Sequence, residues 1–259
     1  MTNADLAALE WYMDAGVDIA IADAPNDRFS KQELETPSFM APEKAPTPRV
    51  AEPKQTDIKI NSSLIEAAKN AASACTNFDE LSAAILEFTD HPLKKTATNM
   101  VLGDGNTKAD IMVIGDPPSN DEDRSGDAFS GVGGQLLDKI LASIDLSRED
   151  AYLTHITHWR PPGNSTPTAE HLALSKPFIE KQIDLVAPQH LLILGNVAAK
   201  TLLDTTKSMS RVRGEWFEYG PSKIPAIVTY TPDFLLNNPL QKRKTWADIL
   251  SLKGKITDA

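Results

Sequence analysis

Side chains able to do chemistry gather in four polar or glycine-containing stretches. These read GDPPSNDEDRSG from Gly115, THITHWRPPGNSTP from Thr154, LGNVAAK from Leu194 and YTPDFLLNNP from Tyr230. The first stretch contributes the carboxylate of Asp116, which could act on water or, beside a proline, hold a turn. The last begins with a hydroxyl, that of Thr231, which can donate one neutral hydrogen bond. We expect the function to lie in these stretches.

Other chemical patterns in the sequence are weak. His155 and His158 are three residues apart on an expected strand, so they point to opposite faces and suit a shared metal poorly. Glycines at an expected helix start could let backbone N–H groups bind a phosphate, although any tight strand-to-helix loop also requires glycine; these are Gly131, Gly133 and Gly134. The sequence contains no P-loop, G-x-S-x-G or HExxH pattern. No metal and no cofactor is predicted.

The elements that must position these stretches alternate between strand and helix. Two helices are expected first, between residues 62 and 88, with a break around residues 76–79. Short apolar runs then predict strands, and helical spacing predicts helices between and after them. The strands are expected at residues 111–115, 152–157, 191–195 and 226–230, and the helices at 134–144, 168–186, 196–203 and 239–252. This βαβ pattern predicts an α/β fold with a mostly parallel sheet, whose ligands bind beyond the C-terminal strand ends.

The N-terminal part of the chain has a different composition. Residues 1–24 predict a short amphipathic helix, and residues 25–59, rich in proline, glutamate, lysine and threonine, predict a disordered linker. The main domain is expected at residues 60–259. The N-terminal helix could bind a partner protein or dock on its own domain, and docking on its own domain is the preferred alternative.

Composition and charge exclude several classes of protein. Lys+Arg 26 against Asp+Glu 36 gives a formal charge of −10, which excludes a wholly basic nucleic-acid binder but allows a local basic face. The single cysteine excludes an internal disulfide and an all-cysteine metal site. The sequence has no apolar run as long as a membrane span and begins with no secretory signal pattern. We therefore expect a cytoplasmic protein with no membrane partner.

Five ordered blocks of the sequence resemble the uracil-DNA glycosylase superfamily, and most closely its family-four bacterial enzymes. They are GDPPSNDEDRSGDAFSGVGGQLLDKIL, YLTHITHWRPPGNSTP, KPFIEKQIDLVAPQHLLILGNVAAKTLL, RVRGEWFEY and TYTPDFLLNNPLQKRKTWADI. The resemblance implies a three-layer α/β/α fold with a central four-stranded parallel sheet. It also implies a monomer that flips a uracil nucleotide out of single- or double-stranded DNA and hydrolyses its glycosidic bond.

The resemblance assigns roles to five pocket residues. Asp116 matches a glutamate that positions water and stabilises the oxocarbenium-like transition state, and the adjacent Pro117 is assigned to substrate binding. Phe129 matches the aromatic that stacks on the flipped base, with core packing as the alternative. His155 matches an asparagine that reads uracil, but imidazole cannot reproduce a side-by-side amide pairing. Thr231 matches a histidine that donates to the uracil oxygen, and one lost transition-state donor costs about 10²–10³ in rate.

Residues outside the pocket are assigned to DNA. Leu235 and Leu236 match apolar residues that enter the helix where a base has left, or else form the core face of a helix. The basic C-terminal part of the chain is either a solvated helix end or a face that contacts phosphates. The residues expected to contact phosphates are Arg213, Lys242, Arg243 and Lys244.

The iron–sulfur ligands of the family are replaced in this sequence. The four cysteine positions fall on Phe88, His91, Trp159 and Ser175, and Phe and Trp cannot ligate iron. We predict that Phe88 and Trp159 form a hydrophobic plug instead. Iron or acid-labile sulfide in the purified protein would contradict this prediction.

Three functions are compatible with the sequence. The leading one is a DNA repair glycosylase with weakened activity on uracil. The second is a catalytically silent DNA-binding or partner-binding module, favoured by the replacements at Asp116, His155 and Thr231 and opposed by the retained carboxylate and aromatic ring. The third is a small-ligand or nucleotide binder that uses the same pocket without DNA.

Overall fold

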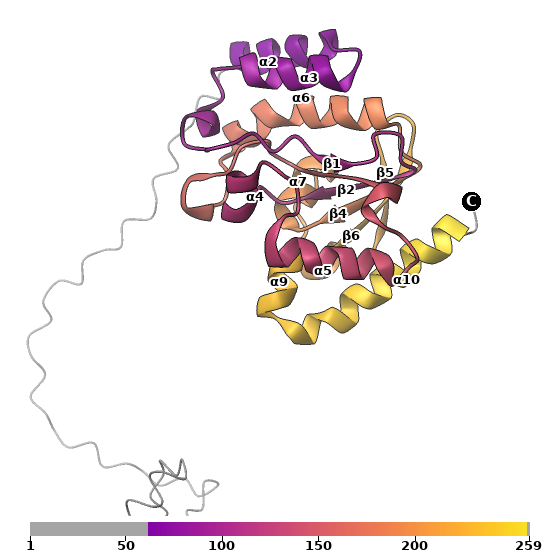
Figure 1. The fold of residues 1–259 in the computed structure, drawn as a ribbon. Coiled ribbons are helices and arrows are strands. Elements are labelled where there is room, and N and C mark those ends of the chain that lie inside the picture. Colours follow the sequence, from indigo (N-terminus) through magenta and orange to yellow (C-terminus); the bar gives the residue numbers. More distant parts are fainter. Residues whose placement is uncertain (1–61, 258–259) are drawn as a thin grey trace, which may run out of the picture. The chain divides into compact units, whose positions relative to one another are not determined.

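The computed structural model describes residues 62–257 (Figure 1). The helix predicted at residues 1–24 and the linker predicted at 25–59 lie outside the described residues. The chain divides into two units, residues 1–54 and residues 55–259. The fold below is that of the described part of the second unit.

Four parallel strands form the centre of the sheet. They are β2 (Ile111–Gly115), β3 (Ala151–His155), β4 (His190–Leu194) and β6 (Ile224–Thr229), arranged side by side as β3-β2-β4-β6. These are the four predicted strands, with ends that differ from the predictions by at most two residues. Every side chain of β2, β3 and β4 is buried, because helices cover both faces of the sheet.

The α/β class is confirmed, and two antiparallel edge strands that the sequence did not predict extend the four parallel strands to a sheet of six. β1 (Asp104–Gly105) pairs antiparallel with β3 at one edge, and β5 (Trp216–Tyr219) pairs antiparallel with β6 at the other. β1 is too short to show any periodicity, and β5 lies on an edge where no side chain is fully buried. Neither strand therefore has the apolar run that identified the central four.

Helices form a layer on each face of this sheet. On one face, α6 (Ala169–Val186) and α7 (Asn196–Leu203) share a core with alternate residues of the central strands. On the other face, α5 (Gly131–Ala142) and α10 (Lys242–Thr257) pack against the remaining strand residues. Figure 1 shows a further helical pair stacked outside α6, formed by α2 (Ser62–Ala74) and α3 (Phe78–Glu87).

Short elements complete the described chain. The short α-helices are α4 (Asn120–Ser125), α8 (Met209–Val212) and α9 (Pro232–Asn237), and the 3₁₀ turns are η1 (Pro92–Lys95), η2 (Arg148–Asp150), η3 (Pro162–Asn164) and η4 (Pro239–Gln241). None of the helices in residues 62–257 is both long and apolar enough to cross a membrane.

Strand register brings the four chemical stretches to one edge of the sheet. Gly115 at the end of β2 is aligned with His155 and with Leu194, and Leu194 is aligned with Thr229. Because these strands are parallel, the residues that follow them emerge side by side. The sheet therefore gathers the loops as the sequence predicted.

Candidate active site

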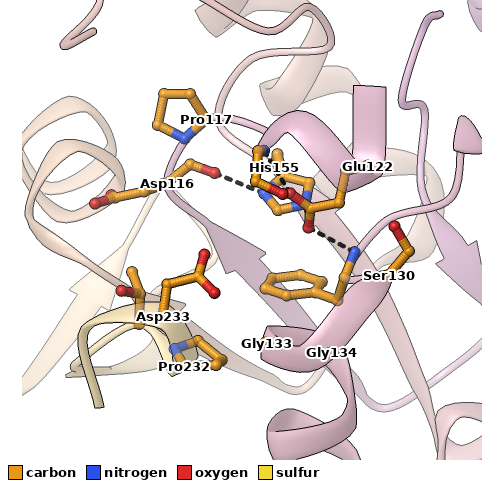
Figure 2. Close-up of a pocket in the computed structure, with 12 residues that line it drawn as sticks. Asp116, Pro117, Glu122, Ser130, Gly133, Gly134, His155, Pro232 and Asp233 are labelled. Atoms are coloured by element: carbon orange, nitrogen blue, oxygen red, sulfur yellow. Dashed lines mark hydrogen bonds and ion pairs between the residues drawn. The ribbon is translucent and has the colours of Figure 1, made fainter. Parts of the chain in front are cut away.

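A pocket of about 100 Å³ lies at the C-terminal ends of β2 and β3 (Figure 2). All five residues predicted to act on the substrate line it, namely Asp116, Pro117, Phe129, His155 and Thr231. Its other lining residues include Glu122, Gly133 and Asp233. Residues more than a hundred positions apart in the sequence are thus brought into one site.

Glu122, at the start of α4, is the centre of the polar network in this pocket. Its Oε1 accepts a hydrogen bond of 2.8 Å from the backbone N–H of Phe129, and its Oε2 accepts one of 2.5 Å from the backbone N–H of Ser119. Nε2 of His155 lies 2.8 Å from Oε1 as an ion pair without good hydrogen-bond alignment. Burial alone would raise the pKa of Glu122, but His155 and Ser119 outweigh it and lower the pKa to about 2. Glu122 is therefore an ionised carboxylate.

His155 faces an acceptor at each ring nitrogen. Nδ1 lies 2.6 Å from the backbone carbonyl oxygen of Asp116, while Nε2 faces the Glu122 carboxylate. Both partners accept and neither donates, an arrangement that favours hydrogen on both nitrogens and therefore the cationic ring. Burial lowers the pKa of His155, but Glu122 and the Asp116 carbonyl raise it above its ordinary value. With both nitrogens engaged by the protein, His155 has no free edge with which to read a base.

Phe129 is held in a strained position over His155. The two rings stack with centroids 4.4 Å apart and planes at 28°. The φ of Phe129 is +51°, a left-handed conformation that is uncommon for a non-glycine residue. Glu122 on its N–H and Arg148, which donates to its carbonyl oxygen at 2.6 Å, hold this conformation. A Cβ on Gly115 would lie 2.6 Å from Cζ of Phe129, so the ring requires glycine beneath it. Strain held by so many contacts is typical of functional sites.

The carboxylate of Asp116 is anchored at the start of α7. Its Oδ1 accepts hydrogen bonds of 2.9 Å from the backbone N–H groups of Val197 and Ala198. Burial raises the pKa of Asp116 to about 6, against the lowering effect of these N–H groups. Asp116 also lines the pocket and two further hollows. Its carboxylate holds the start of α7 rather than the local turn weighed from the sequence, and, ionised at neutral pH, it lies beside the space for a ligand.

The loop after β6 supplies a hydroxyl and an unexpected carboxylate. Oγ1 of Thr231 accepts a hydrogen bond of 3.2 Å from the backbone N–H of Phe234, which caps α9. The hydroxyl hydrogen is not used in this bond and can be donated to a ligand. Two residues later, the side chain of Asp233 points into the pocket (Figure 2).

The basic residues predicted to contact DNA lie in two different settings. Lys242, Arg243 and Lys244 are exposed in the first turn of α10. Arg213 forms an ion pair with the buried carboxylate of Asp248 and donates to the backbone carbonyl of Lys244 at 2.9 Å. The charge of Arg213 is therefore balanced within the fold, and the exposed basic face consists of the three residues on α10.

The two leucines predicted to act at the DNA helix also differ. The side chain of Leu235 is buried at 1% exposure, whereas Leu236 is 37% exposed and the neighbouring Phe234 is 39% exposed. Leu235 therefore packs in the core face of α9, the second of its two sequence interpretations. Leu236 and Phe234 are the large apolar side chains that this short helix presents to solvent.

The positions matched to cluster cysteines come together beside α6. Nε2 of His91 lies 2.9 Å from Oγ of Ser175, and the ring of Phe88 packs at 5.7 Å from that of Phe178. Trp159 belongs to the same core cluster. These side chains do not fit an iron–sulfur cluster because they supply no thiolate. Nor does any group of three or more His, Cys, Asp or Glu side chains between residues 62 and 257 form a metal site.

Sequence reasoning missed three residues of the site. Glu122 had a visible signature, because Ser119 and Glu122 form the S-x-x-E pattern of a capping box. No sequence pattern identified Arg148 or Asp233. The bond from Arg148 to Phe129 joins residues 19 positions apart, and the direction of the Asp233 side chain depends on how α9 packs.

Comparisons with known proteins identify the family. The family model of the uracil DNA glycosylase superfamily matches residues 102–250. The chain is similar to the type-4 uracil-DNA glycosylase of Archaeoglobus fulgidus, with 34% identity over 179 residues that cover 66% of this chain and 89% of the relative. It is also similar to the type-4 enzymes of Thermotoga maritima, 35% identical over 61% of this chain and 82% of the relative, and of Saccharolobus solfataricus, 33% identical over 70% and 87%. The chain therefore belongs to the uracil DNA glycosylase superfamily and is a hydrolase of the DNA N-glycosylase class.

Proposed function

We propose that the protein removes uracil from DNA by flipping the nucleotide into this pocket and hydrolysing its N-glycosidic bond, with weakened activity. The observation that carries the proposal is the meeting of Asp116 and Phe129 in one pocket at the C-terminal edge of a parallel sheet. The names of the type-4 relatives support uracil as the base.

The pocket residues can divide the reaction among them. The bond between C1′ of the sugar and N1 of the base breaks with its electron pair on the base, and water adds to C1′. Asp116 orients this water and stabilises the positive charge that develops on the sugar. Phe129 offers an aromatic surface to the base, and the hydroxyl of Thr231 donates to the uracil oxygen that gains negative charge. Pro117 limits the pocket beside Asp116.

Two pocket residues, His155 and Thr231, support a reduced rate of uracil release. Both nitrogens of His155 are engaged by Glu122 and by the Asp116 carbonyl, so His155 cannot supply an amide-like reading of uracil. Thr231 offers a neutral donor where the family has a histidine. The loss of one transition-state donor costs about 10²–10³ in rate.

The start of α10 supports DNA as the partner. Lys242, Arg243 and Lys244 occupy a first helical turn, where the macrodipole disfavours cations. None of the three forms an ion pair with another residue in the part of the chain that the structure describes. DNA phosphates would relieve this unfavourable charge. In Figure 1 this turn adjoins α9, which begins at the pocket.

Single-turnover release of base from uracil-containing single- and double-stranded oligonucleotides tests the proposal. Asp116→Asn is expected to slow release by at least about 10²-fold, the usual contribution of a group that acts on the reacting water. Phe129→Ala is expected to weaken it, and Asp79→Asn on the exposed surface of α3 is the matched control. Release that does not depend on Asp116 would contradict its role. No release with intact DNA binding would identify a silent DNA-binding module instead.

A further inference from the structure

Asp233 is a pocket carboxylate to which the proposed reaction assigns no role. It lies in the first turn of α9 and lines both the pocket and the adjoining hollow near Pro161. Its side chain points into the pocket that Phe129 also lines (Figure 2). Gly133 of α5 makes room for it, because a Cβ at that position would lie 2.4 Å from Oδ1 of Asp233.

Asp233 is exposed, so solvent rather than a protein cation compensates its charge. Among residues 62–257, no cationic side chain pairs with this carboxylate and no donor forms a hydrogen bond to it. Partial burial raises the pKa of Asp233, as do Glu122 and Asp121, and His155 opposes them only in part. The cation of His155 is already shared between Glu122 and the Asp116 carbonyl. A ligand in this pocket therefore meets two carboxylates, Asp116 and Asp233, beyond the Glu122–His155 pair.

We propose that Asp233 is a specificity-determining residue that adapts the pocket to a cationic, amino-bearing pyrimidine, with N3-methylcytosine as its simplest example. The inference rests on the proposed glycosylase function and names a second substrate class for the same site. Uracil presents one neutral N–H donor between two carbonyl oxygens, and a carboxylate repels these oxygens. N3-methylcytosine carries a positive charge and an exocyclic amino group, and carboxylates accept hydrogen bonds from that group in cytosine.

A cationic base also needs less help in leaving. When its C1′–N1 bond breaks, the electron pair stays on N1 and cancels the positive charge, so the base departs as a neutral molecule. The water oxygen bonds to C1′, and the water proton passes to Asp116 and then to solvent. Uracil departs as an anion and needs a donor at its oxygen, for which Thr231 offers only a neutral hydroxyl. Thr231 and Asp233 thus favour the same class of substrate.

The experiment compares single-turnover release of the two bases from oligonucleotides that differ only at the target position. Wild-type protein is expected to release N3-methylcytosine at least about 10-fold faster than uracil. Asp233→Asn, which keeps the size of the side chain, is expected to reduce this ratio by about 10-fold, as is Asp233→Ala, because both remove the negative charge that favours the cationic base. Glu149→Gln, an exposed carboxylate of η2 outside the pocket, should leave the ratio unchanged.

Each other outcome has a distinct meaning. A ratio that Asp233→Asn and Asp233→Ala leave unchanged would overturn the role of Asp233. Release of uracil but not of N3-methylcytosine would overturn the inference while the proposed function stands. Release of neither base by folded, DNA-binding protein would contradict the proposed function, and the inference with it.

Discussion

At the scale of single residues, the pocket depends on one buried cation, His155, and on the carboxylate that maintains it. Replacing Glu122 by Gln removes the negative charge beside Nε2, so we expect the pKa of the His155 ring to fall. NMR titration of the histidine ring protons measures this directly, with His171 on α6 as the internal control. Breaking a buried ion pair costs about 3–5 kcal/mol, so the free energy of unfolding should fall as well. An unchanged titration of His155 would contradict the pairing seen at 2.8 Å.

A second residue-scale prediction separates stability from activity at Thr231. Thr231→His removes the oxygen that caps α9 and introduces a donor that can carry a charge. The free energy of unfolding should fall by about 1 kcal/mol, the usual cost of a lost cap. Uracil release in a single turnover should rise by up to about 10²–10³. Thr231→Val, which removes the cap without adding a donor, should lower stability without the gain in rate. A histidine variant no faster than the valine variant would contradict a transition-state role for this position.

The family resemblance, rather than geometry, assigned pocket roles to Asp116, His155 and Thr231. The structure places all three in one pocket because the ends of the parallel strands meet at one edge of the sheet. The engagement of His155 by Glu122 was not predictable, because it depends on the packing of a six-residue helix against β3. The burial of side chains on α9 likewise depends on packing. The sequence therefore could not distinguish buried Leu235 from exposed Leu236.

At the scale of elements, the region around α6 carries two buried neutral histidines. Burial lowers the pKa of His91 to about 4 and that of His158 to about 3. In the unfolded chain both bind a proton near pH 6.5, so below that pH the unfolded state takes up more protons and stability falls. Asp116, whose pKa is raised to about 6, acts in the opposite direction between pH 6 and pH 4 but with a smaller shift.

Urea unfolding between pH 8 and pH 4 tests this prediction. The free energy of unfolding is expected to fall progressively below pH 6.5, and to fall also at alkaline pH as His155, whose pKa is raised, loses its proton. His91→Gln, which can keep a hydrogen bond to Ser175, should flatten the curve by roughly 3 kcal/mol at pH 4. The control His190→Gln replaces a histidine at the start of β4, away from this region. Stability that rises on acidification would contradict neutral burial of the pair.

The fold was predictable where elements had a clear pattern. β2 was predicted residue for residue, since five consecutive apolar or small residues preceded a polar loop, and α7 was predicted with the same bounds. α4, α8 and α9 were missed because four to six residues span too few turns to show helical spacing. Caps and tertiary packing, rather than periodicity, stabilise helices of that length.

At the scale of the whole molecule, the protein and DNA both carry net negative charge, so DNA binding must depend on a local basic surface. Replacing Lys242, Arg243 and Lys244 by Ala should weaken DNA binding and lower the slope of log affinity against log salt by up to about 2.7, since each phosphate contact contributes about 0.9. The matched control replaces three other exposed lysines by Ala, namely Lys69, Lys108 and Lys255. This variant removes the same amount of positive charge. If both triple variants change the slope equally, the effect belongs to net charge rather than to the start of α10.

The two antiparallel edge strands have a consequence for the behaviour of the protein at high concentration. An exposed sheet edge can pair with the edge of another molecule and so begin aggregation. Here one edge, β1, spans only two residues, and the other, β5, carries the exposed Glu218, which pairs with Lys223 at 3.3 Å. Short and charged edges offer a poor template for another chain. The four apolar central strands are thereby shielded from other copies during synthesis and storage.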